Sequence, residues 1–135
     1  MDEHDKKIQQ LLNSQTAENN ALAIQLMMGI KQLSFEEAFD CLPFKEHRRD
    51  YYSIDIGKVS LHYFRDHHVM FDYIFIYRML YYDGQKLYKY PQDFYGAEPY
   101  RGLSKEEVFQ EEWDSILADK KKIAPTIKAL FYQED

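Results

Sequence analysis

The sequence predicts an α+β domain in which helices precede and follow a four-stranded antiparallel meander and pack on it. Apolar residues recur at helical spacing over residues 5–42, alternate with polar residues over 51–90, and return to helical spacing over 104–133. The chain has 135 residues, of which 45% are hydrophobic, enough for one core that buries roughly two-thirds of the unfolded surface. We therefore expect a single domain over residues 1–135.

The first segment predicts a helical hairpin followed by a short third helix. Each helix of the hairpin presents one apolar stripe, made by Ile8, Leu11 and Leu12 and by Leu22, Ala23, Leu26, Met27 and Ile30. Thr16 is placed to cap the second helix, and Ser34 followed by Glu37 forms a capping box for the third. Pro43 then ends it, because proline cannot continue a helix.

The middle segment predicts two hairpins. Alternation begins at Tyr51 and reverses at the turn Gly57-Lys58, and a second turn at Asp83-Gly84 leads into a last strand before Pro91. Between them, residues 69–82 are apolar at both alternating positions, which favours one central strand covered on both sides, with a buried helix as the alternative for part of it. The run 66–68 is then expected to form the turn between the hairpins.

The last segment predicts a loop and two helices. Residues 91–102 hold two prolines and two glycines, which is typical of a loop. Ser104 and Glu107 form another capping box before an apolar face made by Val108, Phe109, Trp113, Ile116 and Leu117. Pro125 suits a first helical turn, so a second helix is expected from there to residue 133.

One segment resembles a known class of helices. Leu11-Leu12-Asn13-Ser14 followed by residues 18–26 looks like the short helical units beside leucine-rich or armadillo-like repeats in bacterial proteins. The likeness covers about a fifth of the chain, and no second copy follows. It implies a helical hairpin that docks on a partner and says nothing about chemistry.

Charge and cysteine usage exclude several partners. The net charge of −6 is spread along the chain, and residues 51–100 hold five basic and six acidic side chains, so no basic patch for nucleic acid is expected. No apolar run reaches the ~20 residues that span a bilayer, so no membrane partner is expected. A single cysteine, Cys41, and a polar start without a secretory core favour a cytoplasmic protein.

The sequence predicts no metal or other cofactor and no catalytic residue. Asp66-His67-His68 is the only cluster that hints at a metal, with Asp72 nearby and His62 as a third ligand, but adjacent histidines on an extended chain point to opposite faces. Cys41 has no histidine near it in sequence except His47, which argues against a catalytic thiol.

Two charged residues within the apolar run form an alternative polar site. Asp72 and Arg78 lie six residues apart, on the same face of the predicted strand, and burial of either one without a partner would cost several kcal/mol. They therefore pair, reach an edge or line a cleft. The alternative function is a small hydrolase or a ligand-binding enzyme. In that case, Asp72 and Arg78 would join His62 in a pocket between the sheet and the C-terminal helix.

Aromatic residues predict a binding surface. Residues 51–100 hold 15 of the 22 aromatic side chains, more than a small core easily buries, and exposed tyrosines are favoured at protein interfaces. The predicted binding residues, on the sheet and in the loop 91–102, are Tyr73, Tyr77, Tyr81, Tyr88, Tyr95 and Tyr100. We expect a non-enzymatic, acidic protein-binding module, with a bacterial immunity or inhibitor protein that masks a basic partner as the specific version.

Three hypotheses make different structural predictions. A binding module should show a shallow face that bears tyrosines, whereas an enzyme should bring His62 and Asp72 together in an enclosed cavity. A piece of a larger repeat assembly should leave an apolar stripe exposed on the first helices.

Overall fold

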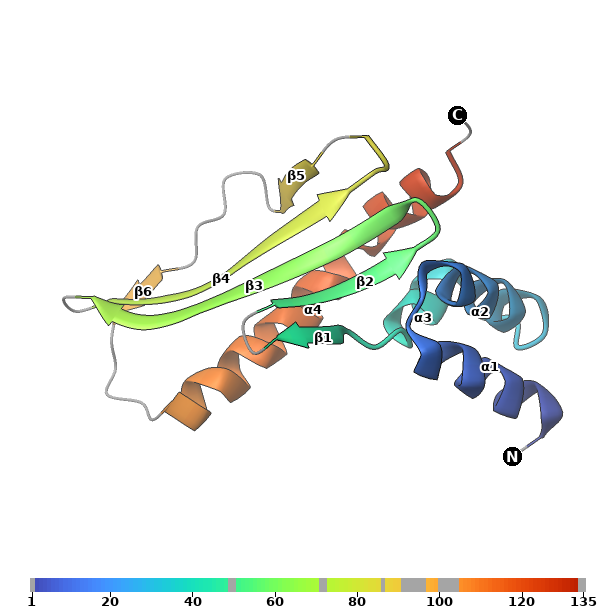
Figure 1. Cartoon of the computed structure of the whole chain (residues 1–135), viewed down its shortest axis with the longest axis horizontal. Helices are drawn as coiled ribbons and strands as arrows, with labels where there is room; N and C mark the ends of the chain where they lie inside the picture. The colour runs from blue at the N-terminus through green and yellow to red at the C-terminus, as the bar shows by residue number, and fades with distance from the viewer. Residues whose placement is uncertain are drawn as a thin grey trace.

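The computed structural model describes residues 2–48, 51–70, 73–85, 87–90, 97–99 and 105–133. Figure 1 shows the order of elements, helices first, then the sheet, then one long helix. The helices are α1 (Glu3–Ser14), α2 (Ala17–Gly29), α3 (Phe35–Asp40) and α4 (Lys105–Phe131). The strands are β1 (Lys45–Arg48), β2 (Tyr51–Ile56), β3 (Val59–Met70), β4 (Tyr73–Tyr82), β5 (Leu87–Tyr90) and β6 (Ala97–Pro99). The α+β class is thus confirmed.

Side-chain caps begin the three N-terminal helices. An Asp2 carboxylate oxygen accepts from the amide of Asp5 at 2.7 Å, and the Thr16 hydroxyl accepts from the amide three residues later at 3.2 Å. Ser34 and Glu37 form the expected capping box, with both reciprocal bonds at 3.0 Å. These caps satisfy amides that have no partner inside the helix, so they define where each helix begins.

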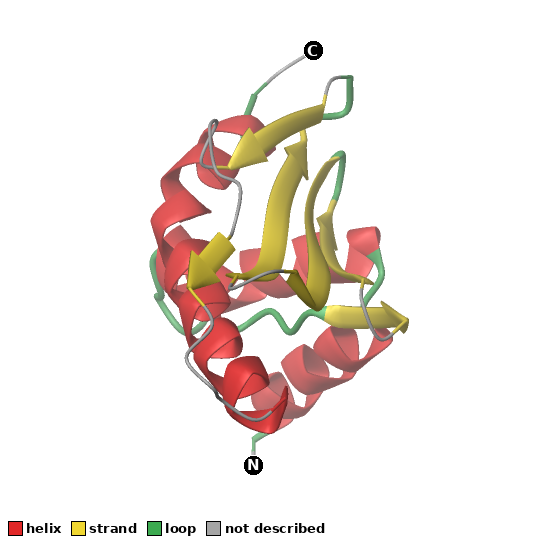
Figure 2. Ribbon diagram, turned by 90° about the vertical axis from the view of Figure 1, so that its left-hand side faces the viewer, coloured by secondary structure: helices red, strands yellow, loops and turns green. Residues whose placement is uncertain are grey.

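The sheet is antiparallel in all its described pairings. Its strand order is β1-β2-β3-β4-β5, and β6 pairs with β4 at residues 73–75 while β5 pairs with it at 79–82. The predicted hairpin around Gly57-Lys58 and the last strand before Pro91 are present, and β1 and β6 are two short strands that the sequence analysis missed. In the view of Figure 2, α4 lies along one side of the sheet.

The predicted single strand over 69–82 is wrong. Val69 pairs with Ile74 and Met70 pairs with Tyr73, so the run is divided between β3 and β4. The predicted turn at residues 66–68 is also wrong, because these residues lie inside β3, where the register shifts between Arg65 and His68. Pairing of β3 with β4 satisfies the backbone groups of both strands, and the register shift accommodates the residues of β3 that have no partner in β4.

The prediction of two C-terminal helices is also wrong, because α4 continues through Pro125. Its buried positions, Ile116, Lys120, Ile123 and Ile127, recur every three or four residues on both sides of the proline. A break in the helix at Pro125 would no longer place the buried residues before and after it on the same side of α4. We infer that packing of this stripe outweighs the ~3 kcal/mol that a proline costs inside a helix.

The core lies between the sheet, α4 and the N-terminal helices. Its largest fully buried side chains are Tyr63, Phe35, Phe39, Ile24, Leu42, Ile54, Ile56, Leu61, Ile116, Ile123 and Ile127. Trp113 of α4 contacts the rings of Phe44, Tyr52 and Tyr63 at centroid distances of 5.8–6.3 Å. None of the described helices is both long and apolar enough to cross a membrane.

The turn between β2 and β3 attaches the sheet to the helices. Gly57 adopts φ +57°, which glycine tolerates, and its amide donates to the Ala17 carbonyl at 3.1 Å. The Asn20 side-chain amide donates to the Asp55 carbonyl at 2.8 Å, and the Lys58 ammonium donates to the Gln133 carbonyl at 2.8 Å. The start of α2 and the residues just after α4 are therefore both bonded to this hairpin.

Candidate functional site

Strands β2 and β3 have two chemically different faces. The core face carries the buried residues Ile54, Ile56, Val59, Leu61 and Tyr63, with Tyr52 half-buried beside them. The opposite face, here called the outer face, carries Tyr51, Ser53, Asp55, Ser60 and His62. Successive side chains of a strand point to opposite faces, so the sequence alternation places these two sets apart.

A hydrogen-bonded network of hydroxyl and imidazole groups occupies the outer face. The two ring nitrogens of His62 each have a hydroxyl partner: Nδ1 lies 2.8 Å from the Tyr51 hydroxyl and Nε2 lies 2.7 Å from Ser60 Oγ. In a second pair, His47 Nε2 lies 2.6 Å from Ser53 Oγ. Ser53 is only 1% exposed, so its hydroxyl needs this partner.

A bulge in β1 brings two side chains to the same place. The β1–β2 register shifts between Glu46 and Arg48, so both His47 and Arg48 lie opposite Tyr51. The His47 ring stacks on the Tyr51 ring at 4.5 Å, and the Arg48 guanidinium lies 5.9 Å from the same ring centroid. His62 lies nearly parallel to Tyr51 at 5.8 Å. Three strands thus contribute one stacked row of rings.

Burial governs the protonation of His62. Desolvation lowers the pKa of His62 below its ordinary value, His47 lowers it further, and the carboxylate of Asp55 acts in the opposite direction. At pH 7 the ring is therefore neutral and holds one donor and one acceptor, as its two hydroxyl partners require. Burial likewise raises the pKa of the Tyr51 hydroxyl, with Asp55 contributing, so this group keeps its proton.

The network has one feature of a hydrolytic site. Ser60 Oγ and His62 Nε2 are at the distance of a nucleophile and its base, and Tyr51 orients the other ring nitrogen. Ser60 is only 9% exposed, however, which limits its access to a substrate. Among the residues that the structure describes, no three histidine, cysteine or acidic side chains are grouped to hold a metal ion.

The predicted site residues are found in different parts of the structure. His62 lies on the outer face, so it does not line a space between the sheet and α4. Tyr81 pairs with Leu61 and packs against the core, half-buried. Tyr73, Tyr77, Arg78 and Tyr88 lie in β4 and β5, but only their backbone is described. Asp72, Tyr95 and Tyr100 lie outside the described residues. The binding prediction for these tyrosines stays a prediction.

Sequence reasoning missed most of the network. His47 was considered only as a sequence neighbour of Cys41, and Tyr51, Ser53 and Ser60 were noted only for their alternation. A signal did exist. A two-residue turn at Gly57-Lys58 places Ile56 opposite Val59, and counting back along both strands from there pairs Ser53 with His62. The contribution of β1 could not be found this way, because it depends on a strand and a bulge without a clear alternation.

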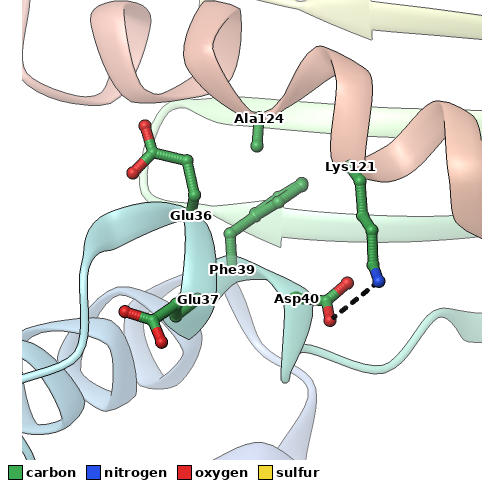
Figure 3. A pocket seen from close by; sticks show the side chains of 6 residues that line it. All are labelled: Glu36, Glu37, Phe39, Asp40, Lys121 and Ala124. Atoms are coloured by element: carbon green, nitrogen blue, oxygen red, sulfur yellow. Dashed lines mark ion pairs between the residues drawn. The ribbon is translucent and has the colours of Figure 1, made fainter.

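A second, shallower feature lies between α3 and α4 (Figure 3). This groove has a volume of about 280 Å³ and is lined by Glu36, Glu37, Phe39, Asp40, Lys121 and Ala124. Lysines of α4 face its carboxylates: Lys121 lies 4.0 Å from Asp40, and Lys128 lies 3.8 Å from Glu36. The groove therefore carries charges of both signs.

Two apolar side chains of α2 are exposed. Leu22 is 40% exposed and Ile30 is 42% exposed, with Leu26 half-buried between them. Other apolar residues of the hairpin, including Leu11, Ala23 and Ile24, are in the core. The described helices thus leave two exposed positions of the stripe that the repeat hypothesis expects, and the resemblance to repeat helices stays a prediction.

Comparison with known proteins adds no relative. No protein-family model, curated protein or solved structure matches the chain.

Proposed function

We propose that this protein is a non-enzymatic module that binds another protein through the outer face of its sheet. The observation that carries this proposal is the stacked row His47, Tyr51 and His62, which spans three strands on the side of the sheet away from the core. The rings of such a row are stacked on one another, and their orientation is already restricted by this stacking and by the hydrogen bonds of Tyr51 and His62. Little side-chain entropy is then lost when a partner covers it.

Exposed tyrosine extends this face. Tyr82 of β4 lies opposite Ser60 and is 36% exposed, so it continues the outer face beyond β3. Tyrosine gives a large contact area with a polar end that tolerates water at the rim of an interface. The network below it holds Tyr51 and the two histidines in place, which supports a preformed surface.

Charge favours a basic partner. The chain carries a net charge of −6, which attracts a positively charged protein over distances of about a Debye length. The outer face itself bears Lys45 and Arg48 on β1 as well as Asp55, so the attraction acts through the whole molecule rather than through this face. A bacterial immunity or inhibitor protein that masks a basic protein is the specific form of this proposal.

The test is recovery of a stoichiometric partner from the cell that makes the protein. The immobilised chain is compared with Tyr82→Ala and with Tyr132→Ala, a control that removes a 53% exposed tyrosine at the end of α4, away from the outer face. We expect a basic partner to be retained by the wild type and by Tyr132→Ala, and to fall about tenfold with Tyr82→Ala. Equal loss from both variants, or no stoichiometric partner, would contradict the proposal.

A second candidate is a serine hydrolase, because Ser60 Oγ lies 2.7 Å from His62 Nε2. A fluorophosphonate probe labels an activated serine, and the label is located by mass spectrometry. Labelling at Ser60 that is lost in His62→Gln would favour the enzyme. We expect no labelling, because this hydroxyl is nearly buried.

A further inference from the structure

The protonation state of His62 decides how its two hydroxyl partners can be satisfied. A neutral imidazole has one donor and one acceptor, so one of the hydroxyls of Tyr51 and Ser60 donates to the ring and the other accepts from it. Adding a proton turns the ring acceptor into a second donor. The hydroxyl that donated must then turn its hydrogen toward another acceptor.

The surroundings of His62 decide when this happens. From β2 it is faced by Tyr51 and by Asp55, whose carboxylate favours the cation. From β1, His47 disfavours the cation, and the Arg48 guanidinium lies 5.9 Å from the centroid of the Tyr51 ring.

In the register of β3 with β4, Leu80 pairs with His62, Tyr82 with Ser60 and Arg78 with Phe64. Burial is the largest influence, and it keeps the pKa of His62 below the value of about 6.5 that is usual for histidine. The ring is therefore neutral at pH 7 and takes up a proton only in a more acidic medium.

We propose that a proton on His62 switches the outer face from a form that holds a basic partner to a form that releases it. This rests on the proposed function of the outer face. Protonation places a positive charge between Tyr51 and Ser60, on a face that also bears Arg48 and His47, and this added charge repels a basic partner. It also reorients the hydroxyl that had donated to the ring, so the polar pattern of the face changes together with its charge.

The first experiment needs no partner. NMR follows the ring signals of His62 and Tyr51 and the amide signal of Ser60 between pH 8 and pH 4.5. We expect the Tyr51 and Ser60 signals to shift with the midpoint of His62, both in the wild type and in His47→Gln, which removes the histidine that stacks on Tyr51. In His62→Gln that titration should be absent, since glutamine offers a donor and an acceptor without charge. Tyr51 and Ser60 signals that stay constant while His62 titrates would overturn the switch.

The second experiment uses the partner recovered in the test above. Partner bound at pH 7.5 should fall about tenfold or more below the His62 midpoint for the wild type, and should stay bound to His62→Gln at the same pH. Release from both proteins at the same pH would overturn the switch. Failure to recover any partner would instead count against the proposed function, and the NMR titration would still decide whether the proton rearranges the face.

A second variant guards against misfolding. Tyr51→Phe keeps the ring and removes only the hydroxyl that contacts Nδ1. We expect the ring signals at position 51 to follow the His62 titration with a smaller shift than in the wild type, while the dispersion of the amide spectrum remains that of the wild type. A shift as large as that of the wild type would show that the hydroxyl does not transmit the change.

Discussion

The two faces of the β2–β3 hairpin have the same backbone and opposite chemistry. On the core face, Leu61 and Tyr63 are 1% and 0% exposed and lie among apolar and aromatic neighbours. On the outer face, His62 forms hydrogen bonds with Ser60 of its own strand and with Tyr51 of the next strand. Burial of apolar surface stabilises the first face, whereas the second gains only the small net energy of exchanging bonds with water for bonds within the protein. The core face therefore contributes more to the stability of the fold than the outer face does.

The largest effect is expected from the core face. Tyr63→Ala removes a fully buried ring that contacts Phe44, Tyr52 and Trp113, and it leaves a cavity between the sheet and α4. We expect a loss of about 3–5 kcal/mol in the free energy of unfolding, measured by urea denaturation. A loss below about 1 kcal/mol would mean that the two faces do not differ as described.

A buried lysine of α4 tests whether the core tolerates a charged group. Lys120 is 2% exposed, and its ammonium donates to the carbonyls of Asp40 and Leu42 at 3.1 and 2.6 Å. Burial lowers the pKa of Lys120 to about 8 in the folded protein. The unfolded chain, with a lysine pKa of about 10.4, then binds more protons between those two values, so stability rises with pH across that window.

The variant Lys120→Met should lack this dependence. We expect the free energy of unfolding of the wild type, relative to the variant, to rise by about 3 kcal/mol between pH 8 and pH 10.5, measured by denaturation at several pH values. Other titrating groups are common to both proteins and cancel in the difference. A difference that stays constant over this range would show that the ammonium remains fully solvated.

The outer face should show a smaller dependence in acid. Folding lowers the pKa of His62, so the folded protein binds fewer protons than the unfolded chain just below pH 6.5. The stability that the neutral network supplies is fully present above about pH 6.5 and is lost as the pH falls through the folded pKa. We expect the wild type to lose about 1 kcal/mol more than His62→Gln on acidification from pH 7 to pH 5, measured by urea denaturation. An equal loss in both proteins would count against the network.

The smallest effect on stability is expected at the exposed end of the outer face. Tyr82→Ala should change the free energy of unfolding by less than about 0.5 kcal/mol, because this side chain is partly exposed at the sheet surface. The same change should strongly reduce partner retention. A large loss of stability would instead assign Tyr82 to the fold and weaken its use as a probe of docking.

Features that depend on neighbouring residues were predicted correctly. Thr16, Ser34 and Glu37 cap helices as expected, and Gly57-Lys58 and Asp83-Gly84 lie between paired strands. The alternation from Tyr51 to Tyr63 separated core residues from outer ones. Caps, turns and alternation involve contacts within a few residues, so the chemistry of a short segment is enough to specify them.

Features that depend on distant pairing were not predicted. An apolar run gives the same local signal whether it is one long strand or two strands paired with each other, so the division between β3 and β4 was missed. Pro125 has the local chemistry of a helix start, and only the packing of Ile123 and Ile127 in one continuous stripe keeps α4 intact.

By itself, the sequence determined the class of fold, the helix starts, the hairpin turns and the separation of two faces on β2 and β3, since each follows from interactions within a few residues. Only the tertiary structure decided that His47, Ser53 and Tyr51 meet Ser60 and His62, because that meeting requires the register of three strands and a bulge in β1. Register is a property of paired strands, and a shift of one residue would move these side chains to the other face.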